Sequence, residues 1–218
     1  MPVLPEVSKS SIRKNTLTLR EQLSPEMHAA HSKAIAERLL QLPEYRQAGA
    51  VLGYMNFGAE FASEVWIRQV LAARKKLALP RVNHHTSQLD LFWVEDLENQ
   101  LATGLWGIRE PIVERCERVI TLNEVEFALL PGVAFSKNGA RLGYGGGFYD
   151  KLLMKQLAIR LGEQTTLAKS LDMAHMTHRP TLAAAAFELQ IMERIPQEAT
   201  DVKVEWIITE QRTINCSA

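Results

Sequence analysis

The sequence has no excess of charge of either sign and little that indicates disorder. It contains 25 Lys and Arg against 25 Asp and Glu among 218 residues, so its formal net charge is zero. Nucleic-acid binders usually carry a basic excess, and the composition therefore argues against a nucleic-acid partner. Apolar residues make up 46% of the chain, which is ordinary for a globular protein and too many for a disordered tail.

Cysteine and long apolar runs are also scarce. The only two cysteines, Cys116 and Cys216, lie far apart and form no CxxC pair. They are typical of free thiols in a reducing compartment. No stretch approaches the roughly 20 apolar residues of a membrane span, and the first residues lack the apolar core of a signal peptide. We therefore expect a cytoplasmic protein without a membrane partner.

Apolar residues alternate along the chain between helical and extended spacing. The SPE triplet at 24–26 is a helix cap with Pro at the first helical position. It divides residues 6–42 into a helix that ends near Leu23 and a second that ends near Leu42. Further helices are predicted at 63–74 and 149–161, and strands at 48–55, 76–80, 89–94, 127–130, 182–187 and 204–209. The pattern at 182–187 also fits a helix, but its flanks favour a strand.

Strands that alternate with helices predict an α/β fold with a mostly parallel sheet flanked by helices. The sequence shows no internal repeat, no low-complexity run and no clear linker. We therefore expect residues 1–218 to form one layered domain, which the chain is long enough to support without a disulfide or metal staple.

The segment most informative about function is a glycine-rich loop between a predicted strand and a predicted helix. Its core is GYGGG at 143–147. Glycines let the backbone adopt positive φ, and N–H groups at such a loop and at the helix start form an anion site. Arg141 adds a cation at its edge, and Asp150 at the helix start is a candidate Mg²⁺ ligand.

The same loop is neither of the two best-known phosphate-binding motifs. No Gly-Lys-Ser/Thr follows it, so it is not a Walker A loop, and its spacing is not GxGxxG. A tight strand-to-helix turn would use the same glycines, and Asp150 could simply complement the helix dipole. The residues alone leave these structural alternatives open.

The segment 131–153, PGVAFSKNGARLGYGGGFYDKLL, resembles the signature of the 5-formyltetrahydrofolate cyclo-ligases, also called 5,10-methenyltetrahydrofolate synthetases. Two positions differ from the family pattern: Phe148 stands where the family has Tyr, and Lys151 where it usually has Arg. The matching residues are Pro131, Gly132, Phe135, Gly139, Arg141, Leu142, Gly143, Gly145, Gly147, Tyr149 and Asp150.

Other segments resemble the same family in the same order, so the likeness runs from Lys9 to Glu210, except over the segment 162–180. KSSIR at 9–13 resembles an N-terminal Lys-x-x-Leu-Arg motif, and Glu60 stands at the position of a pterin-binding glutamate. Ala62 replaces a family threonine. The remaining matches are Pro80-Arg81, the GIREP run at 107–111, AFELQ at 186–190, Asp201 and the segment 204–210.

The resemblance implies a NagB/RpiA/CoA-transferase-like α/β fold and the ATP-dependent cyclisation of 5-formyltetrahydrofolate to 5,10-methenyltetrahydrofolate. In that reaction the formyl oxygen is phosphorylated to an imidate phosphate, and the folate N10 then displaces phosphate. The nucleophile belongs to the substrate, so no Ser/His/Asp triad is needed. ATP and Mg²⁺ are the implied cofactors, and the folate substrate could carry a polyglutamate tail.

The resemblance also implies residue roles. Arg141 and Tyr149 would act in catalysis, and Asp150 and Asp201 would hold Mg²⁺. Those implied in ATP binding are Lys9, Arg13, Arg141, Leu142, Gly143, Tyr144, Gly145, Gly146, Gly147, Phe148 and Tyr149. Those implied in folate binding are Glu60, Gly145, Gly147 and Tyr149. Met55, Tyr54 and Phe57 are candidates to line the pterin pocket as well, although core packing is an equal alternative for Met55. A carboxylate such as Glu60 suits the paired N–H donors of an amino-pyrimidinone edge, and a Lys and an Arg one helical turn apart can face one polyphosphate.

Two alternatives remain at this point. One is a sugar-phosphate or CoA enzyme on the same fold, which would use the glycine loop without folate or ATP. The other is a non-enzymatic folate-binding relative, which loss of Lys9 or Asp150 would have favoured, although both residues are present.

Overall fold

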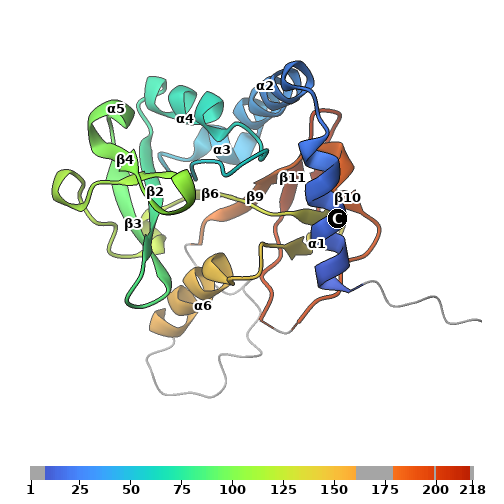
Figure 1. Cartoon of the computed structure of the whole chain (residues 1–218). Coiled ribbons are helices and arrows are strands. Elements are labelled where there is room, and N and C mark those ends of the chain that lie inside the picture. Colours follow the sequence, from blue (N-terminus) through green and yellow to red (C-terminus); the bar gives the residue numbers. More distant parts are fainter. Residues whose placement is uncertain (1–7, 161–178, 199, 217–218) are drawn as a thin grey trace, which may run out of the picture.

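The computed structural model describes residues 8–160, 179–198 and 200–216. Its centre is a seven-stranded sheet in the order β12-β11-β9-β6-β1-β2-β3 (Figure 1). The predicted helix end at Leu161 lies outside the described residues. The strands are β1 (Ala50–Leu52), β2 (Lys76–Asn83), β3 (Gln88–Val94), β6 (Phe127–Leu130), β9 (Thr181–Ala185), β11 (Trp206–Ile208) and β12 (Thr213–Asn215).

The sheet is parallel except at its two edges. β2, β1, β6, β9 and β11 pair in parallel, whereas β3 and β12 pair antiparallel with their neighbours. Inner strands of this kind are covered on both faces, and all four residues of β6 are buried. The prediction of a mostly parallel sheet flanked by helices is confirmed, and the segment 182–187 is a strand over Thr181–Ala185.

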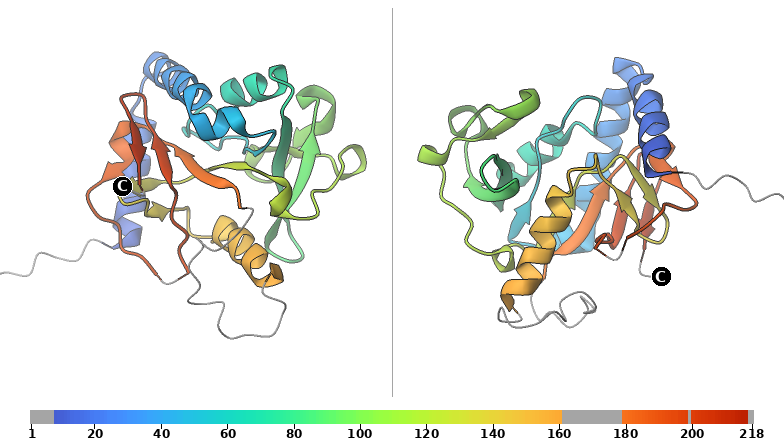
Figure 2. Two further views of the ribbon diagram at one scale, coloured as in Figure 1. Left: turned by 180° about the vertical axis from the view of Figure 1, so that it is seen from behind. Right: turned by 60° about the horizontal axis from the view of Figure 1, so that its bottom comes forward.

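Helices cover both faces of this sheet. α2, α3 and α4 lie on one face and α6 on the other (Figures 1 and 2). Each face has its own apolar cluster: Leu39 and Trp66 pack on the first, and Leu152 and Leu153 on the second. The helices are α1 (Lys9–Glu21), α2 (Pro25–Gln41), α3 (Pro43–Gln47), α4 (Ser63–Ala72), α5 (Leu97–Gln100) and α6 (Phe148–Arg160).

The break between the first two helices follows from their caps. Ser24 accepts a hydrogen bond from the backbone N–H of Met27, and Pro25 occupies the first turn of α2. Ser8 caps α1 in the same way, through the N–H of Ser11. The predicted division of residues 6–42 is therefore confirmed. None of the helices in the described part of the chain combines the length and apolar content of a membrane span.

Two small sheets flank the main one, and their strands are too short for their sequence pattern to predict them. One contains β10, β7 and β8; the other is the β4–β5 hairpin. α1 packs against the first of these sheets, where Ile12 contacts a cluster that includes Leu142. Their bounds are β4 (Leu101–Thr103), β5 (Arg109–Pro111), β7 (Ala134–Ser136), β8 (Arg141–Leu142) and β10 (Ile191–Met192).

This topology brings two loops to one edge of the sheet. The segment 53–62 follows β1, and the chain after β6 leads through β7 and β8 into the glycine loop and α6. Because β1 and β6 are parallel neighbours, their carboxyl ends meet at the same edge. Ligands of open α/β sheets bind at such edges.

Candidate active site

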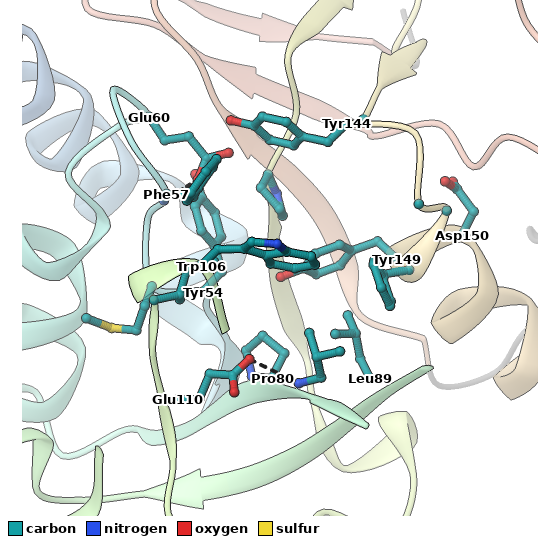
Figure 3. Close-up of a pocket in the computed structure, with 18 of the residues that line it drawn as sticks. Tyr54, Phe57, Glu60, Pro80, Leu89, Trp106, Glu110, Tyr144, Tyr149 and Asp150 are labelled. Carbon is teal, nitrogen blue, oxygen red and sulfur yellow. Dashed lines mark hydrogen bonds between the residues drawn. The ribbon is translucent and has the colours of Figure 1, made fainter. Parts of the chain in front are cut away.

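A pocket of about 470 Å³ opens at this edge of the sheet (Figure 3). Glu60 and Asp150 lie on opposite sides of it, with the rings of Tyr144, Trp106 and Tyr149 between them. It is lined by Tyr54, Met55, Phe57, Glu60, Pro80, Val82, Leu89, Trp106, Ile108, Arg109, Glu110, Pro131, Arg141, Gly143, Tyr144, Gly146, Gly147, Phe148, Tyr149 and Asp150.

Glu60 forms a buried, incompletely paired carboxylate at one end. Only 5% of the surface of Glu60 is exposed. The backbone N–H of Phe57 donates to Oε2 at 2.8 Å, while Oε1 has no hydrogen-bond partner in the described part of the chain. Burial raises the pKa of Glu60, and the Phe57 N–H, the charge of Arg20 and the Tyr144 hydroxyl partly oppose that rise. The free oxygen makes Glu60 an acceptor for a ligand's N–H groups.

Aromatic rings form the walls beside Glu60. The rings of Phe57 and Tyr144 meet edge to face, with centroids 5.9 Å apart. Trp106 lies at the tip of the β4–β5 hairpin with φ of 58°, and 58% of the residue is exposed. Burial, reinforced by the charge of Glu60, raises the pKa of Tyr54 and of Tyr149 well above the usual phenol range. Flat walls beside a lone carboxylate suit a planar heteroaromatic ligand with N–H donors.

The glycine loop forms the opposite end of the pocket. Gly145 and Gly147 have φ of 111° and 64°, which glycine adopts without strain. The chain then enters α6, whose first turn leaves backbone N–H groups for a ligand. A Cβ on Gly145 would lie 3.7 Å from the guanidinium carbon of Arg13, so α1 approaches the loop closely. Arg13 also donates from Nε to the Gly143 carbonyl at 2.8 Å.

Arg141 joins this loop to α6. Its Nη2 donates to Oδ1 of Asp150 at 2.7 Å, and its Nη1 donates to the Pro131 carbonyl at 3.2 Å. Its Nε is buried with no hydrogen-bond partner in the described residues. The guanidinium also lies over the Tyr149 ring, 6.0 Å from its centroid. Arg141 therefore places a positive charge at the pocket wall beside the glycine loop.

Lys9 supplies a second cation near α6, but at present it faces carboxylates. Its Nζ lies 2.7 Å from Oδ2 of Asp201 and 3.0 Å from Oε1 of Glu198. Partial burial works against the charged amine, but the hydrogen bonds that Lys9 donates to Asp201 and Glu198 outweigh it and raise the pKa of Lys9. Lys9 is thus a firmly charged group held by partners that an anionic ligand could replace.

Comparison with known proteins identifies this combination of loop and pocket. A model of the 5-formyltetrahydrofolate cyclo-ligase family matches residues 5–210. The chain belongs to this family. The resemblance drawn from the sequence is therefore confirmed.

Several named members of the family cover most of the chain. A probable 5-formyltetrahydrofolate cyclo-ligase from Caenorhabditis elegans is 26% identical over 98% of both chains. The cyclo-ligase of Escherichia coli K12 is 25% identical over 88% of this chain and 95% of its own. The NMR structure of Aquifex aeolicus 5,10-methenyltetrahydrofolate synthetase is 30% identical, covers 96% of this chain and 93% of its own, and superimposes with a TM-score of 0.76. The fold expected for the family is thus confirmed.

The structure brings most of the predicted site residues to one pocket, but not all. Five do not line it: Lys9, Arg13, Leu142, Gly145 and Asp201. The Leu142 side chain is buried in the cluster beneath α1, so only its backbone is left for a ligand. Those that do line it are Met55, Glu60, Arg141, Gly143, Tyr144, Gly146, Gly147, Phe148, Tyr149 and Asp150.

Several residues of this region had no role assigned from the sequence, among them Trp106, Glu110 and Arg20. Trp106 and Glu110 line the pocket from the β4–β5 hairpin, and Glu110 accepts a hydrogen bond from the Val82 N–H at 3.2 Å. Arg20 lies behind Tyr144, to whose hydroxyl it donates at 2.6 Å. The one sequence signal for Arg20 is its position two helical turns after Arg13, on the same face of α1.

The two predicted metal ligands are both engaged by the protein. Oδ1 of Asp150 accepts from Arg141 and from the Val202 N–H, and Oδ2 of Asp201 accepts from Lys9 and from the Glu198 N–H. The described residues contain no group of three His, Cys, Asp or Glu that could hold a metal alone. Mg²⁺ usually binds through one or two carboxylates, waters and substrate phosphates. Asp150, which reaches the pocket, fits a Mg²⁺ that arrives with a nucleotide.

Proposed function

We propose that this chain catalyses the ATP-dependent cyclisation of 5-formyltetrahydrofolate to 5,10-methenyltetrahydrofolate, with release of ADP and phosphate. The observation that carries the proposal is the polarity of one pocket. A buried carboxylate, Glu60, lies at one end, and the glycine loop with Arg141 lies at the other. The two ends match the two reactants, a pterin with N–H donors and a polyphosphate.

Glu60 would bind the pterin edge. Its free Oε1 and its Oε2 can accept the paired N–H donors of the amino-pyrimidinone ring. Tyr54, Phe57 and Tyr144 would enclose the ring, and Met55 would contact its face. Recognition of this kind needs an ionised carboxylate, since a protonated one loses an acceptor.

The glycine loop would bind the phosphates. Gly143, Gly146 and Gly147 line the pocket with little bulk, so the backbone N–H groups are open to oxygen atoms. Lys9 and Arg13 approach from α1 and would exchange Glu198, Asp201 or the Gly143 carbonyl for phosphate oxygens. Each cation would keep an oxygen acceptor in this exchange.

The chemistry requires positioning and charge stabilisation. The formyl oxygen attacks the γ-phosphorus, and the bond to ADP breaks. N10 then attacks the formyl carbon, loses its proton, and phosphate leaves with the former formyl oxygen. Arg141 would stabilise the negative charge on the transferring group. Because burial raises the pKa of Tyr149, its hydroxyl stays protonated and can act as a hydrogen-bond donor to the reacting oxygen.

Mg²⁺ would neutralise phosphate charge, with Asp150 and then Asp201 as its carboxylate candidates. Asp150 reaches the pocket directly, whereas Asp201 lies behind it beside Lys9. The use of ATP and Mg²⁺, a cytoplasmic location and the acceptance of polyglutamylated folate remain predictions.

The proposal is tested by mixing the purified chain with 5-formyltetrahydrofolate and Mg²⁺, with and without ATP, and following the ultraviolet absorbance of the methenyl product. We expect a rise that needs both protein and ATP. Folate binding without any rise would instead indicate a folate-binding relative that has lost the reaction. The absence of both turnover and folate binding would indicate that the glycine loop serves a different phosphate compound.

A further inference from the structure

Arg20 is a buried cation that the pocket lining does not include. It lies on α1 with 3% of the residue exposed. Its Nη2 donates to the Tyr144 hydroxyl at 2.6 Å, and its guanidinium lies over the Tyr144 ring, 5.7 Å from the centroid. Its Nε and Nη1 are buried and have no hydrogen-bond partner in the described part of the chain. A buried charge with so few partners is costly unless an opposite charge is close.

The opposite charge is Glu60. Arg20 lowers the pKa of the Glu60 carboxyl, which burial would otherwise raise further. The Tyr144 hydroxyl, which accepts the hydrogen bond from Arg20, lowers the same pKa. Arg20, Tyr144 and Glu60 therefore form a chain of interacting polar groups from α1 through the glycine loop to the segment after β1.

The other groups around Glu60 do not replace this charge. Tyr54, from the segment after β1, and Tyr149, from α6, are phenols whose pKa values the charge of Glu60 raises. His28, from α2, contacts the backbone oxygen of Glu60 at 2.7 Å and not its carboxylate. Among the described groups that act on the Glu60 carboxyl, Arg20 is therefore the cation.

We propose that Arg20 is a positioning residue for folate recognition, which balances the buried Glu60 charge and holds the Tyr144 ring at the pocket wall through its hydroxyl. The inference rests on the proposed function, since it concerns how the folate end of that pocket is kept ready. Without Arg20, burial would leave Glu60 protonated up to a higher pH. A protonated Glu60 would lose an acceptor for the pterin N–H donors.

The test uses Arg20→Met, Arg20→Lys and Tyr144→Phe, with Arg46→Met as the matched control, because Arg46 is an exposed arginine on α3. The KM values for 5-formyltetrahydrofolate and for ATP are measured across pH, together with the melting temperature. In Arg20→Met we expect the folate KM to rise about tenfold or more, as the loss of a charge-assisted contact implies. In the pH profile of kcat/KM for folate, the fall at low pH (the acid limb) should move to higher pH. The ATP KM should change by less than about twofold.

The other variants separate charge from packing. Arg20→Lys keeps the positive charge, so its acid limb should stay near that of the wild type while its folate KM is intermediate. Tyr144→Phe keeps Arg20 and should move the limb by less than Arg20→Met does. Arg46→Met should match the wild type throughout.

Two results would overturn the inference. In the first, Arg20→Met keeps the acid limb of the wild type, and its KM values for folate and ATP change alike or not at all. Arg20 would then be a purely structural residue. If Arg20→Met does not fold, a wild-type folate KM in both Arg20→Lys and Tyr144→Phe would have the same meaning. A wild-type chain that neither binds nor converts the folate would overturn the proposed function itself, which the wild-type assay shows before any variant is made.

Discussion

The two ends of the pocket differ in whether their charged side chains form ion pairs. At the glycine-loop end, two cations form ion pairs with carboxylates: Arg141 with Asp150, and Lys9 with Asp201 and Glu198. Only Nε of Arg141 is buried there without a hydrogen-bond partner in the described residues. At the other end, Glu60 and Arg20 are almost completely buried, and each leaves polar atoms without a hydrogen-bond partner in the described residues. The first end must exchange partners when a ligand binds, whereas the second is built around bonds that a ligand completes.

The difference predicts where single substitutions matter most for binding. Partly exposed ion pairs contribute only about 0.2–1 kcal/mol because solvent screens them. Removing one partner of a buried pair costs about 3–5 kcal/mol, since the remaining charge is left uncompensated. Changes at the folate end should therefore alter folate affinity strongly, whereas loss of the partly exposed Lys9 at the phosphate end should have a small effect.

The largest effect is expected from Asp150→Ala. It removes the carboxylate that orients Arg141 and is the candidate Mg²⁺ ligand. The loss of one stabiliser of transition-state charge lowers kcat by about 10²–10³-fold, while folate affinity should change little. Steady-state kinetics and folate titration check both, with the exposed Glu114→Ala as control. Wild-type turnover in Asp150→Ala would remove Asp150 from this role.

Glu60→Gln is expected to have the next largest effect, on folate binding. A charge-assisted hydrogen bond is worth about 1.5–3 kcal/mol, so the folate KM should rise roughly 10- to 150-fold. The ATP KM should stay near the wild-type value, because the glycine loop is untouched. Glu37→Gln, an exposed glutamate on α2, is the matched control. An unchanged folate KM would refute the pterin assignment.

The pH dependence of folate binding sharpens the same point. Burial raises the pKa of Glu60 above its ordinary value, so on acidification Glu60 becomes protonated at a higher pH than an exposed glutamate would. On acidification, the folate KM of the wild type should therefore begin to rise at a pH above 4.5, the ordinary pKa of glutamate. Measured in parallel, Glu60→Gln should lack this limb. A limb of equal size in both proteins would assign it to another group.

The smallest effect is expected from Lys9→Met. Lys9 is only partly buried, and its pairs with Asp201 and Glu198 are partly screened. Its loss should raise the ATP KM several-fold and lower stability by less than about 1 kcal/mol. Lys14→Met, an exposed lysine on the same helix, serves as control for both measurements. Equal ATP KM values in the two variants would leave Lys9 a structural role only.

The sequence predicted the main sheet and the glycine-loop end well because their signals are local. The cap at Ser24 and Pro25 divides α1 from α2. The apolar run of β6 leads toward a loop that is recognisable in the sequence by its run of glycines. Most residues predicted for that loop line the pocket, because they are neighbours in the chain. The strands predicted at 76–80 and 89–94 are β2 and β3, but their antiparallel pairing as a hairpin was not predicted.

The long-range contacts at both ends of the pocket could not be predicted, because they join distant segments. Arg20 meets Tyr144 across 124 residues, and Lys9 meets Asp201 across 192. No periodicity shows that Lys9 faces carboxylates or that Arg20 is buried behind a tyrosine. The strands of the small sheets, two or three residues long, carry too little pattern to be predicted.

The central claim is that one pocket brings the formyl oxygen of a folate bound at Glu60 to the γ-phosphorus of ATP bound at the glycine loop. Its most direct test is a single turnover with 5-formyltetrahydrofolate labelled with oxygen-18 in the formyl group. Mass spectrometry then follows the label in the released inorganic phosphate. The account predicts that the label appears in phosphate as the methenyl product forms. Product formation with unlabelled phosphate, and the label lost to water, would contradict it.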